Sequence, residues 1–461
     1  MRHEYLLIAA LLLLCASVGC RSSEPATEGA PAATSAQEAP KEATTPAEEV
    51  KGESKEEAKG AAPSKESAVA TILKRLDGNI AFHEKRARDN PTSWIDLERV
   101  AHYHMSRARL TGSYDDYAKA EDALKRAFAR ASDKSGPLLT RARFNATLHR
   151  FDAAEADLAR YAAKPMLSAE DRANVVAMRG DLALQEGKLD EAGERYQEAL
   201  KLRSASSHMV RMAHLLRYQG HHDKAQEWLD RAVKASRLDG EMGRAWTLLQ
   251  RGLLDLERGR LDEADAFYAQ AEELFSGWYL IEEHRAEILA LNGKLTEAEA
   301  LYRDILARAP SPEFMDALAD TLEALDEPEE ARTWRAKATA AYKKDLARFP
   351  EATYGHALDH VLASDDAAFA LELARKNHDL RPGPEAKVKL AQALVKAGKP
   401  EEARPLIEAA GAMGWGTPEY HASAYWLWTR LKQPDKAKPH RARVEAVDPG
   451  VLEELAWMKG A

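Results

Sequence analysis

Six carboxylates between residues 283 and 323 have the spacing to act together, because residues three or four apart share one face of a helix: Glu283, Glu287, Glu313, Asp316, Asp320 and Glu323. We call this set the acidic row. Like charges so placed cost an isolated helix about a few tenths of a kcal/mol per pair, which favours a use for them. Ionised carboxylates bind cations, here a basic segment of a partner protein. The alternative is an acidic surface that is merely solvated.

Charge is distributed unevenly along the chain. Residues 239–330 carry 23 acidic and 8 basic side chains, residues 67–238 carry 24 against 30, and residues 331–461 carry 17 against 21. An acidic middle therefore lies between mildly basic flanks, which bears on partners and solubility rather than on fold. No basic patch with interleaved aromatic residues is present, so we expect no nucleic-acid partner.

Motifs of catalysis and cofactor binding are not found. The sequence has no phosphate-binding loop, no Gly-x-Ser-x-Gly elbow and no His-Glu-x-x-His pair. His221 and His222 are adjacent, and His102 and His104 are two apart, a spacing that a helix turns to different faces. We therefore predict a protein without catalytic residues, cofactor or metal ligands.

Cys20 is the most informative single residue. It follows the apolar stretch 6–14 and the small residues 16–19. This arrangement resembles the lipoprotein signal of bacterial envelope proteins, in which residues 1–19 would be removed and Cys20 acylated. Ser17 departs from that pattern, where a larger aliphatic residue is commoner, so secretion with cleavage elsewhere is the alternative. The apolar stretch is shorter than the roughly 20 residues that span a bilayer.

Residues 20–66 are predicted to be a disordered tether. They consist mainly of Ala, Pro, Glu, Thr, Ser and Lys and contain no aromatic residue. Such a segment buries too little apolar surface to offset the entropy lost on ordering. The folded part would therefore stand away from the membrane to which Cys20 attaches it.

Residues 67–461 show helical periodicity and a repeat. Apolar residues recur at three- and four-residue spacing, which predicts an all-α fold. A hinge that ends in alanine recurs at 187–192, 259–264, 293–298 and 398–403, with weaker copies at 220–225, 326–331 and 432–437. The alanines are 33, 39, 34, 33, 72 and 34 residues apart, and the longest gap holds one more unit, hinged at Asp365.

These spacings and residue types resemble the tetratricopeptide repeat, a helix–turn–helix unit of about 34 residues. Gly180, Gly187, Ala192, Tyr196 and Ala199 match its small and aromatic positions in order, and 252–271 repeats the match. The resemblance implies a right-handed superhelical solenoid of about ten units over 67–461. It also implies that the first helix of each unit lines a concave groove, so that the acidic row would form adjacent rungs there. Family members that bind the C-terminal carboxylates of chaperones use Lys, Arg and Asn in this groove. Because this chain has acids there, we do not expect it to bind chaperone C-termini.

Together these features predict a non-enzymatic protein-binding scaffold of the bacterial cell envelope, anchored by lipid at Cys20. Assistance in assembling an outer-membrane machine follows by analogy with repeat-containing lipoproteins. Arg21 stands where an aspartate would resemble an inner-membrane retention signal, which favours the outer membrane, facing the periplasm. The alternatives are an accessory subunit of an envelope enzyme complex and an enzyme whose site is not recognisable from sequence.

Overall fold

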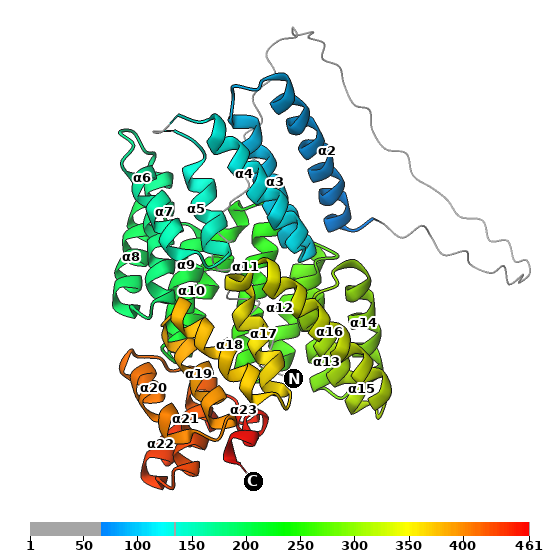
Figure 1. Ribbon diagram of the computed structural model, residues 1–461, viewed down its shortest axis with the longest axis vertical. Coiled ribbons are helices and arrows are strands. Elements are labelled where there is room, and N and C mark those ends of the chain that lie inside the picture. The colour runs from blue at the N-terminus through cyan, green and yellow to red at the C-terminus, as the bar shows by residue number, and fades with distance from the viewer. Residues whose placement is uncertain (1–65, 133–134, 461) are drawn as a thin grey trace, which may run out of the picture.

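The computed structural model describes residues 66–132 and 135–460. The predicted signal (1–19), Cys20 and the predicted tether up to residue 65 lie outside the described residues. Within the described part, every regular element is helical, as the sequence predicted (Figure 1). None of these helices is both long enough and apolar enough to cross a membrane.

The helices form successive pairs, each a hairpin of two packed helices. A single helix, α2 (Ala68–Asp89), precedes them, and the short α23 (Gly450–Glu454) follows. In chain order the pairs are α3 (Ile95–Thr111) with α4 (Tyr114–Arg130), α5 (Leu138–Thr147) with α6 (Phe151–Ala162), α7 (Ala169–Gln185) with α8 (Leu189–Leu202), α9 (Ser206–Tyr218) with α10 (His222–Ala235), α11 (Glu241–Glu257) with α12 (Leu261–Leu274), α13 (Tyr279–Leu291) with α14 (Leu295–Arg308), α15 (Pro312–Ala324) with α16 (Pro328–Arg348), α17 (Pro350–Ala363) with α18 (Ala367–Leu380), α19 (Pro384–Lys396) with α20 (Pro400–Ala412), and α21 (Pro418–Arg430) with α22 (Pro434–Glu445).

The predicted hinges close these pairs. Gly187, Gly259, Gly293 and Gly398 all have positive φ angles between 66° and 78°. This left-handed conformation costs glycine nothing and ends the first helix of each pair. At the weaker copy 326–331 the same place is taken by Asp326, with φ of 64°. Aspartate tolerates this conformation better than most residues, so the hinge survives without glycine.

Small residues let the two helices of a pair approach closely. A Cβ atom added to Gly180 would lie 2.6 Å from the Tyr196 ring, and one added to Gly252 would lie 2.4 Å from the Tyr268 ring. Both tyrosines are fully buried. The glycine–aromatic match that the sequence predicted is therefore a contact between the two helices of one unit.

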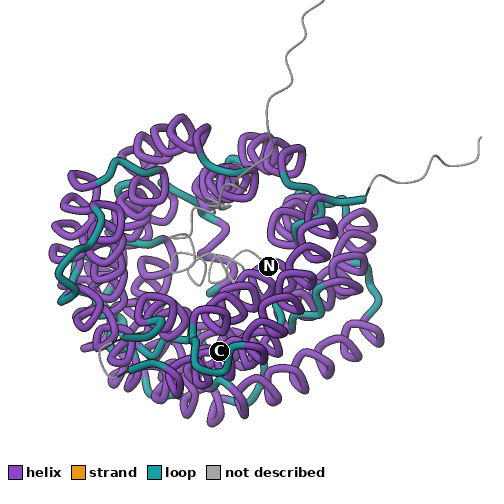
Figure 2. The backbone as a smooth tube through the Cα atoms, turned by 90° about the horizontal axis from the view of Figure 1, so that it is seen from above, coloured by secondary structure: helices purple, strands orange, loops and turns teal. Residues whose placement is uncertain are grey.

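The first helix of a pair is more deeply buried than the second. In α11 every residue from Ala245 to Glu257 is buried, whereas α12 buries only Ala264, Tyr268 and Ala271. Viewed from above, the helices form a ring around a central axis (Figure 2). The first helices, including α13 and α15, are thus the inner helices of the solenoid and the second helices are the outer ones.

Units far apart in the chain touch one another, because the solenoid winds through more than one turn. We call this contact the inter-turn seam. It includes the Trp278 indole N–H donating to the carbonyl of Arg109, an Arg381 guanidinium N–H donating to His149, stacked rings of Tyr114 and Phe349, and the Gly416 N–H donating to the carbonyl of Tyr218. Trp278 and Arg109 are 169 residues apart, and Arg381 and His149 are 232 apart. The seam makes the solenoid a more compact body than an open array of repeats.

Candidate functional site

Three residues of the inner helix α13 form a buried charged cluster. The ring of His284 lies between two carboxylates, with Nε2 3.0 Å from Glu283 and Nδ1 3.3 Å from Glu287. The outer helix of the preceding pair, α12, contributes Tyr268, whose ring stacks on His284 with centroids 5.4 Å apart. Oε2 of Glu283 and Oε1 of Glu287 have no partner among the described residues, although both side chains are buried. The buried carboxylate oxygens without partners could therefore accept hydrogen bonds from an additional cation or neutral donor.

The pKa values of Glu283 and His284 are both raised. Burial raises the pKa of Glu283 to about 7, although His284 opposes the shift. Burial alone would lower the pKa of His284, but the neighbouring Glu283 and Glu287 outweigh it and raise this pKa to about 9. Near neutral pH the native cluster thus holds protons that the same groups would release in the unfolded chain.

We expect Glu283→Gln to leave stability unchanged at pH 5 and to raise it at pH 8. Between the ordinary glutamate pKa and about 7, native Glu283 holds a proton that the unfolded chain has lost, so wild-type stability falls as pH rises through that range. The shift corresponds to at most on the order of 3 kcal/mol. Urea denaturation at the two pH values measures it, with the exposed Glu263→Gln as control. An equal effect of Glu283→Gln at both pH values would rule out the raised pKa.

Three of the remaining four acids of the row contact side chains from neighbouring helices. Arg335, on α16, forms an ion pair with Asp320 and lies 3.6 Å from both Asp316 and Glu323. The His360 ring, on α17, lies 2.9 Å from Asp316. These contacts place one guanidinium and one imidazole beside three of the four acids of α15.

Glu313, at the start of α15, is also engaged. The Ser311 hydroxyl donates to one of its oxygens, and the His356 ring of α17 lies 3.3 Å from the other. Its side chain is 14% exposed.

The structure therefore corrects the predicted form of the acidic row. Its members do lie on the inner helices α13 and α15, but Glu283, Glu287 and Asp316 are buried, and only the Glu323 side chain is mostly exposed, at 52%. Spacing along one helix cannot show which cations another helix brings, and Arg335 and His360 come from helices later in the chain. The acidic row is therefore not an open, continuous row of free carboxylates, and its buried oxygens without a partner in the described part of the chain are on α13.

The α13 cluster also has the donor set of a cation site. Glu283, His284 and Glu287 each offer one ligand atom, and these atoms lie within 4.8 Å of one another. Carboxylate oxygen and imidazole nitrogen suit several divalent metals. However, each ring nitrogen of His284 faces a different carboxylate, so the imidazole serves as an internal counter-ion here. His284 was not among the histidines considered from sequence; its signal was its position three residues before Glu287.

The histidines considered from sequence take other roles. His104 lies 3.0 Å from the buried Asp116 of α4. Burial lowers the pKa of His102 to about 3, so its ring is neutral. His221 and His222 lie at the hinge before α10, where the side chain of His221 is exposed and that of His222 is buried.

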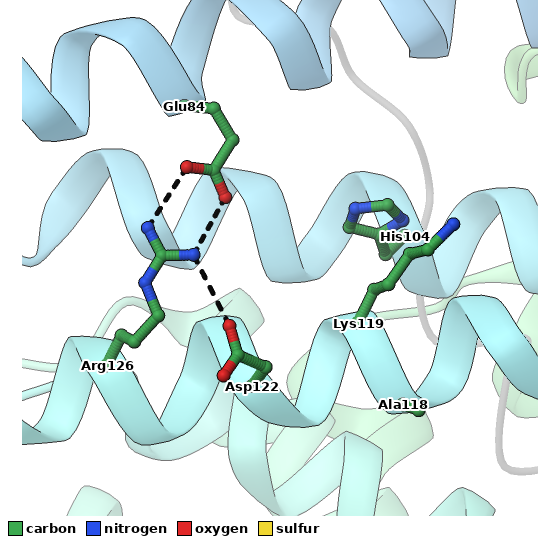
Figure 3. Close-up of a pocket in the computed structure, with 6 residues that line it drawn as sticks. All are labelled: Glu84, His104, Ala118, Lys119, Asp122 and Arg126. Atoms are coloured by element: carbon green, nitrogen blue, oxygen red, sulfur yellow. Dashed lines mark hydrogen bonds and ion pairs between the residues drawn. The ribbon is translucent and has the colours of Figure 1, made fainter.

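A hollow of about 410 Å³ lies among α2, α3 and α4 (Figure 3). Arg126 donates two hydrogen bonds to Glu84, of 2.9 and 3.0 Å, and is also 3.3 Å from Asp122. These side chains satisfy one another across the hollow, whose other polar lining residues are Lys119 and His104. The arrangement ties α2 to α4 and presents no set of converging functional groups.

Comparison with known families identifies the repeat. Residues 204–276, which contain α9 to α12, and residues 384–409, which contain α19 and most of α20, each match a tetratricopeptide repeat model. The chain therefore contains tetratricopeptide repeats, as its sequence predicted. The comparison with curated protein sequences returned no match.

Comparison with solved structures finds similar chains at low identity. Yeast Tom70 is 16% identical, with a TM-score of 0.43, over 84% of this chain and 90% of that one. NprR in complex with its cognate peptide NprX is 15% identical, with a TM-score of 0.43, over 68% of this chain and 97% of that one. A tetratricopeptide repeat protein from Parabacteroides merdae is 16% identical, with a TM-score of 0.34, over 56% of this chain and all of that one. The helical hairpins of the chain and its two repeat matches make the fold an all-α solenoid of the tetratricopeptide type.

Proposed function

We propose that this chain is a non-enzymatic scaffold of the bacterial envelope, anchored by lipid at Cys20, that binds a protein or peptide partner through a basic segment. Solenoids of stacked helical hairpins present extended binding surfaces. The function of each depends on the residues of a particular site and not on the fold. The site is the α13 cluster. The observation that supports it is the pair of buried carboxylate oxygens, Oε2 of Glu283 and Oε1 of Glu287, that no donor in the described part of the chain satisfies.

The cost of these unsatisfied oxygens explains why a cation should be bound there. A buried carboxylate without donors loses its hydration and gains nothing in return. Above about pH 7, where Glu283 has lost its proton, His284 supplies one positive charge against two carboxylates. A guanidinium or ammonium group from a partner would supply the second, with donors for the free oxygens. Because the cluster is buried, such a group must displace inner-helix side chains as it enters, which predicts slow association.

The test is binding of a short synthetic peptide rich in arginine and lysine. We expect Glu283→Gln/Glu287→Gln to weaken its affinity by at least about tenfold, since removing one partner of a buried charge pair costs about 2–5 kcal/mol. Wild-type affinity should fall as salt is raised from about 0.1 M to about 1 M, where the Debye length shortens from about 10 Å to about 3 Å. Fluorescence anisotropy measures both effects.

The matched control is Glu263→Gln/Glu273→Gln. Both residues are exposed on the outer helix α12, and the double change alters net charge by the same amount. If this control weakens binding as much as the α13 variant does, the peptide responds to overall charge and the α13 site is excluded.

The anchor has its own test. We expect Cys20→Ala to abolish sedimentation with membranes after a high-salt wash, because the lipid is the proposed attachment. Cys15→Ala serves as control, since Cys15 lies within the predicted signal. Cys20→Ala protein that still sediments with membranes would show that the attachment lies elsewhere.

The proposal includes localisation to the outer membrane, facing the periplasm, and a role in assembling an envelope machine. Fractionation of outer from inner membranes tests the localisation.

A further inference from the structure

A second hollow lies on the inter-turn seam, where two turns of the solenoid are held together. The hinge between α9 and α10 packs against the loop between α20 and α21. The Gly416 N–H donates to the Tyr218 carbonyl at 2.8 Å, and the rings of Tyr218 and Trp415 stack with centroids 4.6 Å apart and planes inclined by 16°. A Cβ atom on Gly416 would lie 2.8 Å from the Gln219 carbonyl oxygen. These contacts fix the walls of a cavity of about 390 Å³.

Positive charge gathers in this cavity from both turns. Its charged lining residues are Asp223 and Lys224 of α10, Arg258 at the end of α11, and Arg443 of α22. Arg258 donates a 2.8 Å hydrogen bond to Asp223, which cancels those two charges. Lys224 and Arg443 form no ion pair with any residue of the described part of the chain. Two cations of like sign thus face one hollow without a counter-ion.

The remaining polar groups favour the same sign of ligand. Helix α10 is 14 residues long, and its N-cap, His221, makes no side-chain capping bond to the first turn. Its N-terminus therefore presents backbone N–H groups and the positive end of the helix dipole to the cavity. Burial lowers the pKa of His421 to about 3, so this ring adds polarity but no charge.

We infer that this hollow binds a small oxyanion, the phosphate or carboxylate group of a ligand, between Lys224 of one turn and Arg443 of the next. Cations and helix N-termini are the groups that recognise such anions. Because the ligand would bridge residues more than two hundred positions apart in the chain, its binding would fasten the seam. This site shares no residue with the α13 cluster and stands independently of the function proposed above.

The experiment is titration of the protein with inorganic phosphate and, separately, with acetate, by calorimetry at constant ionic strength. We expect saturable binding to the wild type, and at least about tenfold weaker binding to Lys224→Gln and to Arg443→Gln. Both side chains are exposed, so neither change should unfold the chain. Lys234→Gln, an exposed residue of α10 outside the cavity, is the matched control and should bind as the wild type does. The anion that binds with the higher affinity shows whether the site recognises a phosphate or a carboxylate group.

A second measurement distinguishes a site on the seam from general anion binding. Hydrogen exchange of the Gly416 amide, whose N–H bonds across the seam, should slow when the preferred anion is added, and should not slow in Lys224→Gln. No saturable binding of either anion, or equal binding by wild type and both cavity variants, would overturn the inference.

Discussion

Arg211→Met is expected to destabilise the units around α7 to α10 by about 3–5 kcal/mol, the cost of removing one partner from a buried ion pair. Arg211 is the largest fully buried side chain among the described residues. Its Nε donates to both oxygens of Asp181 on the preceding inner helix, at 2.8 and 3.0 Å, and the Tyr196 hydroxyl donates to the same carboxylate at 3.0 Å. Without Arg211, the Asp181 charge remains buried with one neutral donor.

Hydrogen exchange in α7, α8 and α9 measures this loss as a fall in the free energy of local opening, which suits a repeat array better than a single unfolding transition. The double variant Asp181→Asn/Arg211→Met is the comparison, because asparagine still accepts a hydrogen bond from Tyr196 but leaves no buried charge. We expect this double variant to recover a substantial part of the loss. A single-variant cost below about 1 kcal/mol would mean that the pair contributes little.

Gly252→Ala is expected to destabilise the α11–α12 unit by about 1–3 kcal/mol, the usual cost of overpacking a buried contact. Its new methyl group would lie 2.4 Å from the buried Tyr268 ring, which must move together with the outer helix. Gly78→Ala is the matched control, since Gly78 is also inside a helix but has no atom within 4 Å of an added Cβ. There the change should stabilise by about 0.5–1 kcal/mol, the helix-propensity difference between the two residues. Chemical denaturation of both variants measures the contrast, and effects of the same sign would refute the close-packing role of Gly252.

The features that repeat along the chain could be predicted from its sequence because each depends on residues close together. A glycine at a hinge, an alanine after it and a tyrosine four residues further on specify one hairpin. Gly252 and Tyr268 are within one unit, and their contact follows from that unit alone. The same local logic identified the hinge at Asp326, although it lacks glycine.

The seam could not be predicted, because it depends on the curvature of the whole solenoid. A small rotation at each unit accumulates over several units before Tyr218 meets Trp415. No short stretch of sequence specifies this accumulated rotation. The cavity with Lys224 and Arg443 was missed for this reason, although the two residues are ordinary in their own helices.

The acidic row was predicted in part. Helical spacing grouped its six residues on two helices, and the resemblance to the tetratricopeptide repeat implied that these are inner helices, as they are. Whether each carboxylate is free depends on partners such as Arg335, which the same reasoning could not place. The structure thus narrows the candidate site from the whole row to Glu283 and Glu287, together with His284.

The most direct test of the α13 site is to locate a bound basic segment on the protein. An arginine-rich peptide that carries a photoreactive benzophenone is mixed with the full chain, irradiated, and the labelled residues are identified by mass spectrometry. We predict labels on the inner helices α13 and α15, and their loss in Glu283→Gln/Glu287→Gln but not in Glu263→Gln/Glu273→Gln. Labels confined to outer helices such as α12 and α14, or unchanged labelling of the α13 variant, would contradict the proposal.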